Sequence, residues 1–200
     1  MTLPSQCFVV SALNFGQLSI GLGIGFSSIL IPPLKNVTAW SESGVRISVG
    51  VSEVSWIVSL VSIGQVGGSI IGGLLASGIG RKGNHVHQVY THHHNTISLS
   101  GAILLSIIPS ITGWCVLGIS QNVNMLYAGR VLCGLGMGIE GTVHPVYVCE
   151  VCSPAIRGPL AASGVIVITT GVLLSYILGT FISWKLCAWI FLSVHVGYTE

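Results

Sequence analysis

Glu140, His144 and Tyr147 are the residues whose types and spacing are best suited to chemistry in this sequence. With about 3.6 residues per turn, they share one face of a helix, and Glu140 and His144 are close enough to pair directly. An ionisable group inside an apolar segment costs at least about 2.5 kcal/mol, so it usually faces a cavity or a partner. We therefore predict that the three side chains line a solute pathway, in which Glu140 exchanges a proton. The alternative is an interhelical hydrogen bond that only fixes packing.

The composition indicates that these residues lie in a membrane protein. Hydrophobic residues make up 51% of the chain and charged residues only 6%, whereas roughly a quarter of the residues in a soluble domain are charged. The mean hydropathy is +0.86. A formal net charge of +2 is too small and too scattered to indicate nucleic-acid binding. The chain contains no Asp, and it offers no nucleophile-base-acid set, phosphate loop or metal quartet. We expect neither an enzyme nor a cofactor.

Apolar runs predict five full membrane crossings and part of a sixth. About 20 helical residues cross the hydrocarbon core of a bilayer. The expected spans are 8–31, 54–79, 97–120, 126–150, 159–182 and 185–198, of which the last is too short to cross. Pro32 and Pro33 are expected to end the first helix. The predicted fold class is an all-α polytopic membrane helix bundle.

Glycines follow a helical spacing in the second span. Gly64, Gly68 and Gly72 stand four residues apart, so they fall on one helix face. Small residues at this spacing allow two helix backbones to approach closely in a membrane. We predict that this face contacts another helix.

Two polar segments separate the first three spans. Asn36-Val37-Thr38 is the only N-glycosylation sequon, and its use would place residues 35–53 outside and the N-terminus in the cytoplasm. Residues 83–96 are expected to form a histidine-rich loop insert, which contains His85, His87, His92, His93 and His94. Dense imidazoles can bind zinc or sense pH. The favoured alternative is a disordered insert, and we assign no metal site.

The stretch 129–158 resembles the signature of the sugar porter family of the major facilitator superfamily. The family's elements G-R, G-x-G-x-G, P-x-Y, E, P and R-G stand here as Gly129-Arg130, Gly134, Gly136, Gly138, Pro145-Val146-Tyr147, Glu150, Pro154 and Arg157-Gly158. Residues 52–60 resemble the entry to the second helix in facilitated trehalose transporters of this family. Gly80-Arg81-Lys82 is similar to the end of the superfamily's loop motif between helices two and three. Ser77 and Gly78 stand where that motif has its charged residues.

The resemblance implies the N-terminal six-helix half of a twelve-helix transporter, with its sixth helix truncated and its helices arranged as 3+3 inverted repeats. It implies transport of a hexose or a trehalose-like disaccharide by alternating access. Glu150 and Arg157 would form cytoplasmic salt bridges to the second half and contribute to gating. Val165 stands where sugar porters commonly place a sugar-binding Gln.

The implied partners are a small-molecule sugar and a lipid bilayer, most naturally that of the plasma membrane. The missing half of the pathway would come from a homodimer or from a C-terminal half, and we expect a truncated product. One alternative is a non-transporting membrane partner that modulates full-length transporters. Another is a six-helix zinc exporter, suggested by the helix count and the histidines, although such exporters use Asp ligands and this chain has none.

Overall fold

The computed structural model describes residues 3–35, 50–80 and 88–197, which form six helices. The helices are α1 (Leu3–Lys35), α2 (Val51–Gly80), α3 (Gln88–Gly118), α4 (Val123–Val151), α5 (Arg157–Phe181) and α6 (Trp184–Gly197). The described residues contain no strand. The predicted all-α class is therefore confirmed.

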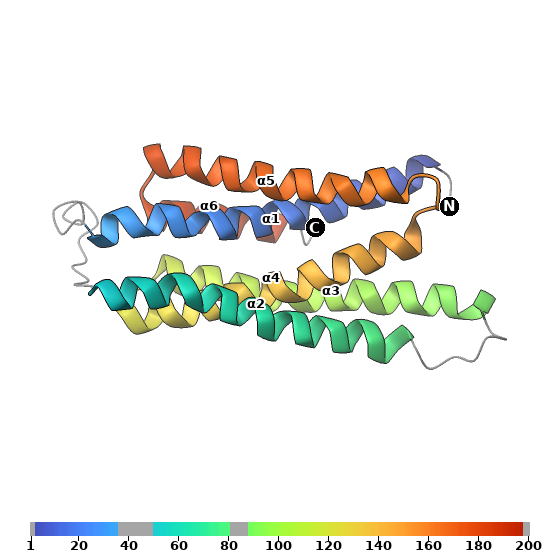
Figure 1. Ribbon diagram of the computed structural model, residues 1–200, viewed down its shortest axis with the longest axis horizontal. Helices are drawn as coiled ribbons and strands as arrows, with labels where there is room; N and C mark the ends of the chain where they lie inside the picture. Colours follow the sequence, from blue (N-terminus) through green and yellow to red (C-terminus); the bar gives the residue numbers. More distant parts are fainter. Residues whose placement is uncertain (1–2, 36–49, 81–87, 198–200) are drawn as a thin grey trace.

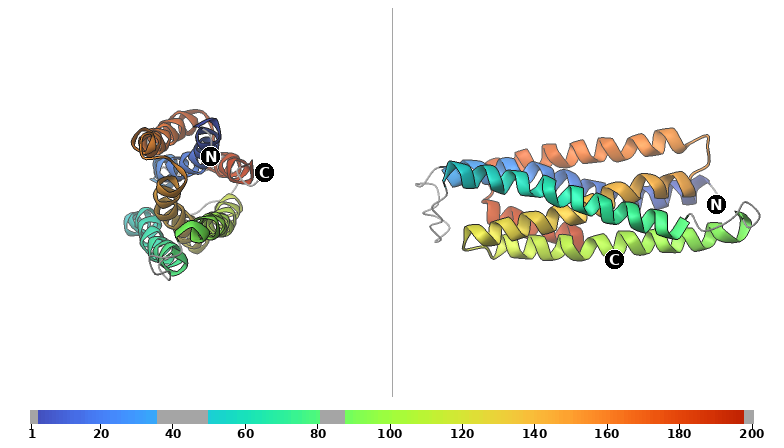
Figure 2. Two further views of the ribbon diagram at one scale, coloured as in Figure 1. Left: turned by 90° about the vertical axis from the view of Figure 1, so that its right-hand side faces the viewer. Right: turned by 60° about the horizontal axis from the view of Figure 1, so that its bottom comes forward.

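The helices form two groups of three that exchange members between the two halves of the sequence. Figure 1 shows α1, α5 and α6 along one side of the molecule and α2, α3 and α4 along the other. The most extensive contacts join α2 to α4, α3 to α4, and α1 to α5. The end view in Figure 2 shows the same two groups. Contacts of α3 with α6 and of α1 with α4 connect them. Each group thus combines the first helix of one half of the sequence with the second and third helices of the other half.

Glycines let helix backbones touch in two of the three most extensive contacts, those of α2 with α4 and of α1 with α5. A Cβ atom added to Gly64 of α2 would lie 3.0 Å from the Cα of Gly134 in α4. One added to Gly21 of α1 would likewise lie 3.0 Å from the Cα of Gly171 in α5. Gly68 and Gly72 also contact the α4 backbone closely. The predicted contact face of the second span is confirmed. Helices α1 and α5 also pack through facing glycines.

Three aromatic rings connect the two groups. Phe26 of α1, Trp114 of α3 and Phe191 of α6 form this aromatic cluster, with ring centroids 5.1 Å, 5.9 Å and 5.3 Å apart. All three ring pairs meet edge to face, which is a favourable geometry for aromatic side chains. The cluster holds α1, α3 and α6 together inside the bundle.

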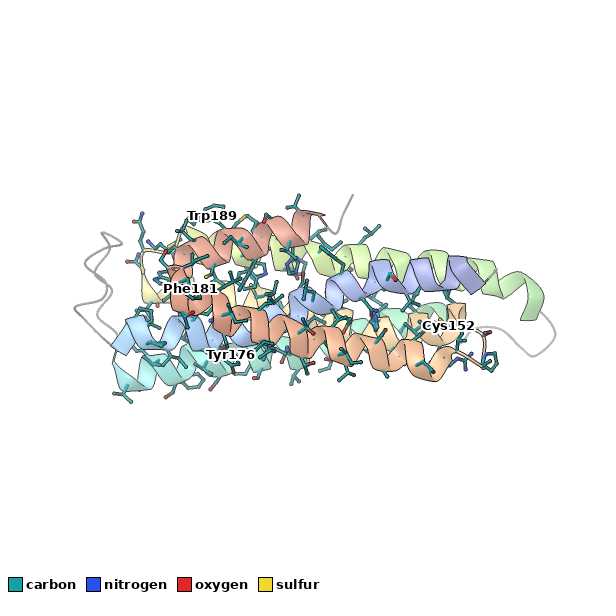
Figure 3. All side chains as sticks on the ribbon, turned by 90° about the horizontal axis from the view of Figure 1, so that it is seen from above. Cys152, Tyr176, Phe181 and Trp189 are labelled. Atoms are coloured by element: carbon teal, nitrogen blue, oxygen red, sulfur yellow. The ribbon has the colours of Figure 1, made fainter. Side chains whose placement is uncertain are left out.

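The outer surface is apolar, as a lipid-facing surface must be. Three helical stretches among the described residues are long and apolar enough to cross a membrane, namely Leu13–Leu34, Val51–Ala76 and Pro154–Phe181. Tyr176 and Phe181 of α5 and Trp189 of α6 are 51%, 84% and 44% exposed (Figure 3). Helix α4 is not among these stretches. Its buried face carries glycines, Arg130, Glu140 and His144, as expected where small and polar residues of a membrane helix face other helices.

Two local expectations differ from the structure. Pro32 and Pro33 do not end the first helix, since α1 continues to Lys35 with both prolines inside it. The fixed φ angle of proline is compatible with a helix, and neighbouring helices help a span to tolerate it. The expected loop 83–96 is helical from Gln88 onward, so His92, His93 and His94 belong to α3. His85 and His87 lie outside the described residues.

Candidate functional site

The structure buries two of the three predicted pathway residues. Glu140 and His144 of α4 are 4% and 6% exposed. Tyr147 is half-buried, and its ring packs against the apolar cluster that contains Val143 and Val148. Among the described residues, no hydrogen bond or ion pair joins Glu140 to His144, although they are one turn apart. Their polar atoms therefore remain available to other groups.

Polar side chains from three helices converge at Gly164 of α5. A Cβ atom added there would lie 3.0 Å from Cε1 of His144 in α4. It would also lie 3.6 Å from Oδ1 of Asn14 and 3.7 Å from Cγ of Gln17, both in α1. The absence of a side chain at Gly164 thus lets these groups lie close against the backbone of α5. We call Asn14, Gln17, His144 and Ser163 the polar cluster.

Most of the hydrogen-bonding capacity of the polar cluster is unused. Asn14 donates from Nδ2 to Oγ of Ser163 at 2.9 Å, and Ser163 donates to the Leu160 carbonyl at 2.7 Å. The buried atoms that have no hydrogen-bond partner in the described structure include Asn14 Oδ1, Gln17 Nε2, His144 Nε2 and Glu140 Oε1. Buried polar atoms are nearly always paired in proteins. Those of Asn14, Gln17 and His144 gather at Gly164, and they indicate a place for a polar ligand or water.

The unpaired atoms include both hydrogen-bond acceptors and donors. Asn14 Oδ1 accepts, Gln17 Nε2 donates, and a neutral histidine nitrogen does one or the other. A hydroxyl group also donates one hydrogen bond and accepts up to two. The polar cluster can therefore bind a ligand that carries several hydroxyl groups.

Replacing Asn14 with alanine is expected to lower the free energy of unfolding by about 1 kcal/mol, because it removes the hydrogen bond between α1 and Ser163. The measurement is detergent-based denaturation of the purified chain. Thr180→Ala serves as the control, since the Thr180 hydroxyl is exposed and bonds only within its own helix. Equal losses in the two variants would contradict a structural role for the Asn14–Ser163 bond.

Sequence reasoning did not identify Asn14, Gln17 or Ser163. A signal existed for the first two, since they are amides three residues apart in an apolar span. The resemblance pointed instead to Val165, which is 62% exposed, whereas the adjacent Gly164 is buried. In a helix, neighbouring residues differ by about 100° in direction, so a shift of one position changes the face. Within this bundle the polar cluster meets at Gly164.

The signature residues lie at several places along the bundle. Arg130 is buried on α4, and Gly129 beside it packs against Leu117 of α3.

Glu150 and Arg157 are half-buried at the far end of α4 and the start of α5. Among the described residues no ion pair joins them, and Arg157 Nη2 donates to the Cys152 carbonyl at 3.4 Å. Gly158 faces open space, Gly80 ends α2, and Arg81, Lys82 and Asn36 lie outside the described residues.

Among the side chains that the structure describes, no three His, Cys, Asp or Glu residues gather to form a metal site. The side chains of His92, His93 and His94 fall outside the described side chains.

Comparison with known proteins identifies relatives along nearly the whole chain. A family model described as "Sugar (and other) transporter" matches residues 7–193. Solute carrier family 2, facilitated glucose transporter member 8 of Mus musculus is 34% identical over 174 residues, covering 87% of this chain and 32% of that protein. Sugar transporter ERD6-like 6 of Arabidopsis thaliana is 31% identical over 182 residues, covering 91% and 31%.

A third relative is the facilitated trehalose transporter Tret1 of Bombyx mori, which is 26% identical over 183 residues, 92% of this chain and 31% of that protein. The chain therefore spans about a third of the length of the curated relatives that it matches.

Proposed function

This chain belongs to the sugar (and other) transporter family and is a multi-pass membrane protein, and from that membership we propose that it acts in the transport of sugars. The observation that carries the proposal is the polar cluster, where helices α1, α4 and α5 meet at Gly164 with hydrogen-bonding atoms unpaired. The proposed substrates are a hexose or a trehalose-like disaccharide. The names of the mouse and silkworm relatives, a glucose and a trehalose transporter, support this choice.

The chemistry of the polar cluster supports a neutral, polyhydroxylated substrate. Each sugar hydroxyl needs both an acceptor and a donor, and Asn14 Oδ1 and Gln17 Nε2 supply one of each. The amide pair carries no charge, so a neutral ligand does not leave a buried cation or anion unpaired there. Glu140 and His144 extend this set along α4 as the proposed pathway residues, and Tyr147 follows one turn later.

We propose that the six helices form one wall of the pathway and operate by alternating access. The second wall comes from a further six-helix half or from a second copy of this chain. Glu150 and Arg157 have no ion-pair partner among the described residues, which leaves both able to form the proposed gating salt bridges to that second wall. We propose the plasma membrane as the location.

A second candidate is a membrane protein that binds full-length transporters and modulates them. The observation in its favour is the large apolar surface of α2 and α5, whose apolar stretches are only 22% and 17% buried within the described structure. Such a surface can face either lipid or another membrane protein.

The test is binding and uptake of labelled glucose and trehalose by the full chain in lipid nanodiscs and liposomes. Saturable binding with uptake supports a carrier, and saturable binding without uptake supports one wall of a pathway. Failure to bind either sugar, together with co-purification of the chain with a full-length sugar transporter, would favour the modulator. Failure to bind alone would contradict the proposal for these two substrates.

Replacing Glu140 with glutamine is expected to weaken sugar binding about tenfold, or roughly 1.4 kcal/mol, and to remove its dependence on pH. Glutamine keeps the size of the side chain but cannot release a proton. The measurement is a sugar-binding isotherm at several pH values. Glu53→Gln is the control, because the Glu53 carboxylate accepts from the Gly50 backbone N–H at the start of α2. Unchanged binding and pH dependence in Glu140→Gln would exclude the pathway role.

A further inference from the structure

Arg130 is a buried cation without a counter-charge in the described structure. It lies in the third turn of α4 and is only 1% exposed. Its Cζ atom lies over the Phe26 ring, 4.7 Å from the ring centroid, in a cation–π contact. A cation–π contact compensates only part of the cost of removing a charge from water.

One edge of this guanidinium has no acceptor. The Nε and Nη2 atoms are both buried and lack hydrogen-bond partners among the described residues. These two nitrogens lie on the same side of the planar group, so their N–H bonds point in parallel. Arginine binds anions through such a pair of parallel donors. The vacant edge is therefore suited to an anion by both charge and geometry.

Acidic residues of the same helix do not supply the missing charge. Glu140 lies almost three turns further along α4, roughly 15 Å away at 1.5 Å per residue. Glu150 lies further still along the helix, and no ion pair of Arg130 is present in the described part of the chain. An uncompensated buried charge is strongly destabilising. A bound anion would remove this penalty.

We propose that Arg130 binds a small monovalent anion of the size of chloride at its Nε and Nη2 edge. A single negative charge balances one guanidinium, whereas a divalent anion would leave an excess charge in apolar surroundings. The neighbourhood favours a small ion, because Phe26, Trp114 and Leu126 are fully or almost fully buried in the same apolar core. This site is distinct from the polar cluster, so it does not depend on the proposed sugar.

The test compares the thermal stability of the full chain in nanodiscs in sodium chloride and in sodium gluconate at constant ionic strength. Gluconate is too large for a closely packed interior. Chloride is expected to raise the unfolding midpoint by about 3 °C and to saturate, as binding to the folded state requires. Arg130→Gln is expected to abolish the rise. Lys185→Gln, which also removes one positive charge, is the matched control and should keep it.

A second variant covers the case in which Arg130→Gln does not fold. Arg130→Lys keeps the charge but loses the paired donors. The chloride concentration at half-saturation is therefore expected to rise at least about tenfold, which corresponds to roughly 1.4 kcal/mol of binding free energy. The proposal is overturned if chloride and gluconate stabilise the native chain equally. It is also overturned if Arg130→Gln retains the chloride response, or if Arg130→Lys saturates at the native concentration.

Discussion

Replacing Gly134 with alanine is expected to lower the free energy of unfolding by about 3 kcal/mol, at the upper end of the cost of overpacking a core. A Cβ atom at this position would lie 3.0 Å from the Cα of Gly64 and closer still to the carbonyl oxygen of Val61. Both are backbone atoms of α2, so no side-chain rotation relieves the overlap. Helices α2 and α4 would have to separate. The measurement is the midpoint of denaturation in detergent.

Gly141→Ala is the matched control for this prediction, because it makes the same change on the same helix. Gly141 is exposed, and an added Cβ would meet nothing within 4 Å. Alanine is a better helix former than glycine by up to about 1 kcal/mol, so the control is expected to be neutral or stabilising. Equal destabilisation of the two variants would show that the cost does not come from the contact between α2 and α4.

Replacing Gly164 with valine is expected to weaken sugar binding at least about a hundredfold, or roughly 2.7 kcal/mol. Its Cβ would lie 3.0 Å from His144 Cε1, and its two methyl groups would occupy the space beside Asn14 Oδ1 and Gln17. The unpaired polar atoms would then face methyl groups instead of the hydroxyl groups of a ligand. The measurement is equilibrium binding of labelled glucose and trehalose to the full chain in nanodiscs.

Gly73→Val is the control for the second prediction. Gly73 lies on α2, away from the polar cluster, and a Cβ atom there would meet nothing within 4 Å. The control should bind sugar as the native chain does. Native-like binding by Gly164→Val, with the helix content of both variants intact, would rule out the region around Gly164 as the sugar site.

Both predictions depend on the exchange of helices between the two halves of the chain. The contact of Gly134 with Gly64 brings α4 against α2, and the contact of Gly171 with Gly21 brings α5 against α1. The second contact places Gly164, two turns earlier on α5, beside Asn14 and Gln17 of α1. The glycine contacts that hold the bundle together therefore also assemble the candidate site.

The helical class of this protein follows from its sequence. A chain with 51% hydrophobic and 6% charged residues has to satisfy its backbone hydrogen bonds internally in lipid, and separate helices do so. The spacing of Gly64, Gly68 and Gly72 correctly predicted a contact face, and the signature over 129–158 correctly predicted the family. The sequence also pointed to Glu140 and His144, because polar residues in an apolar span are conspicuous. Their roles in a solute pathway remain predictions.

The partners of those residues were decided only by the tertiary structure. Helical periodicity states which residues share a face, but it does not state which faces of different helices meet. Asn14 and Ser163 are far apart in the sequence, and they form a hydrogen bond because α1 packs directly against α5. The burial of Arg130 beneath Phe26 depends in the same way on the approach of α1 to α4. Composition and spacing thus determined the elements and their contact faces, whereas the order and rotation of the packed helices determined the site.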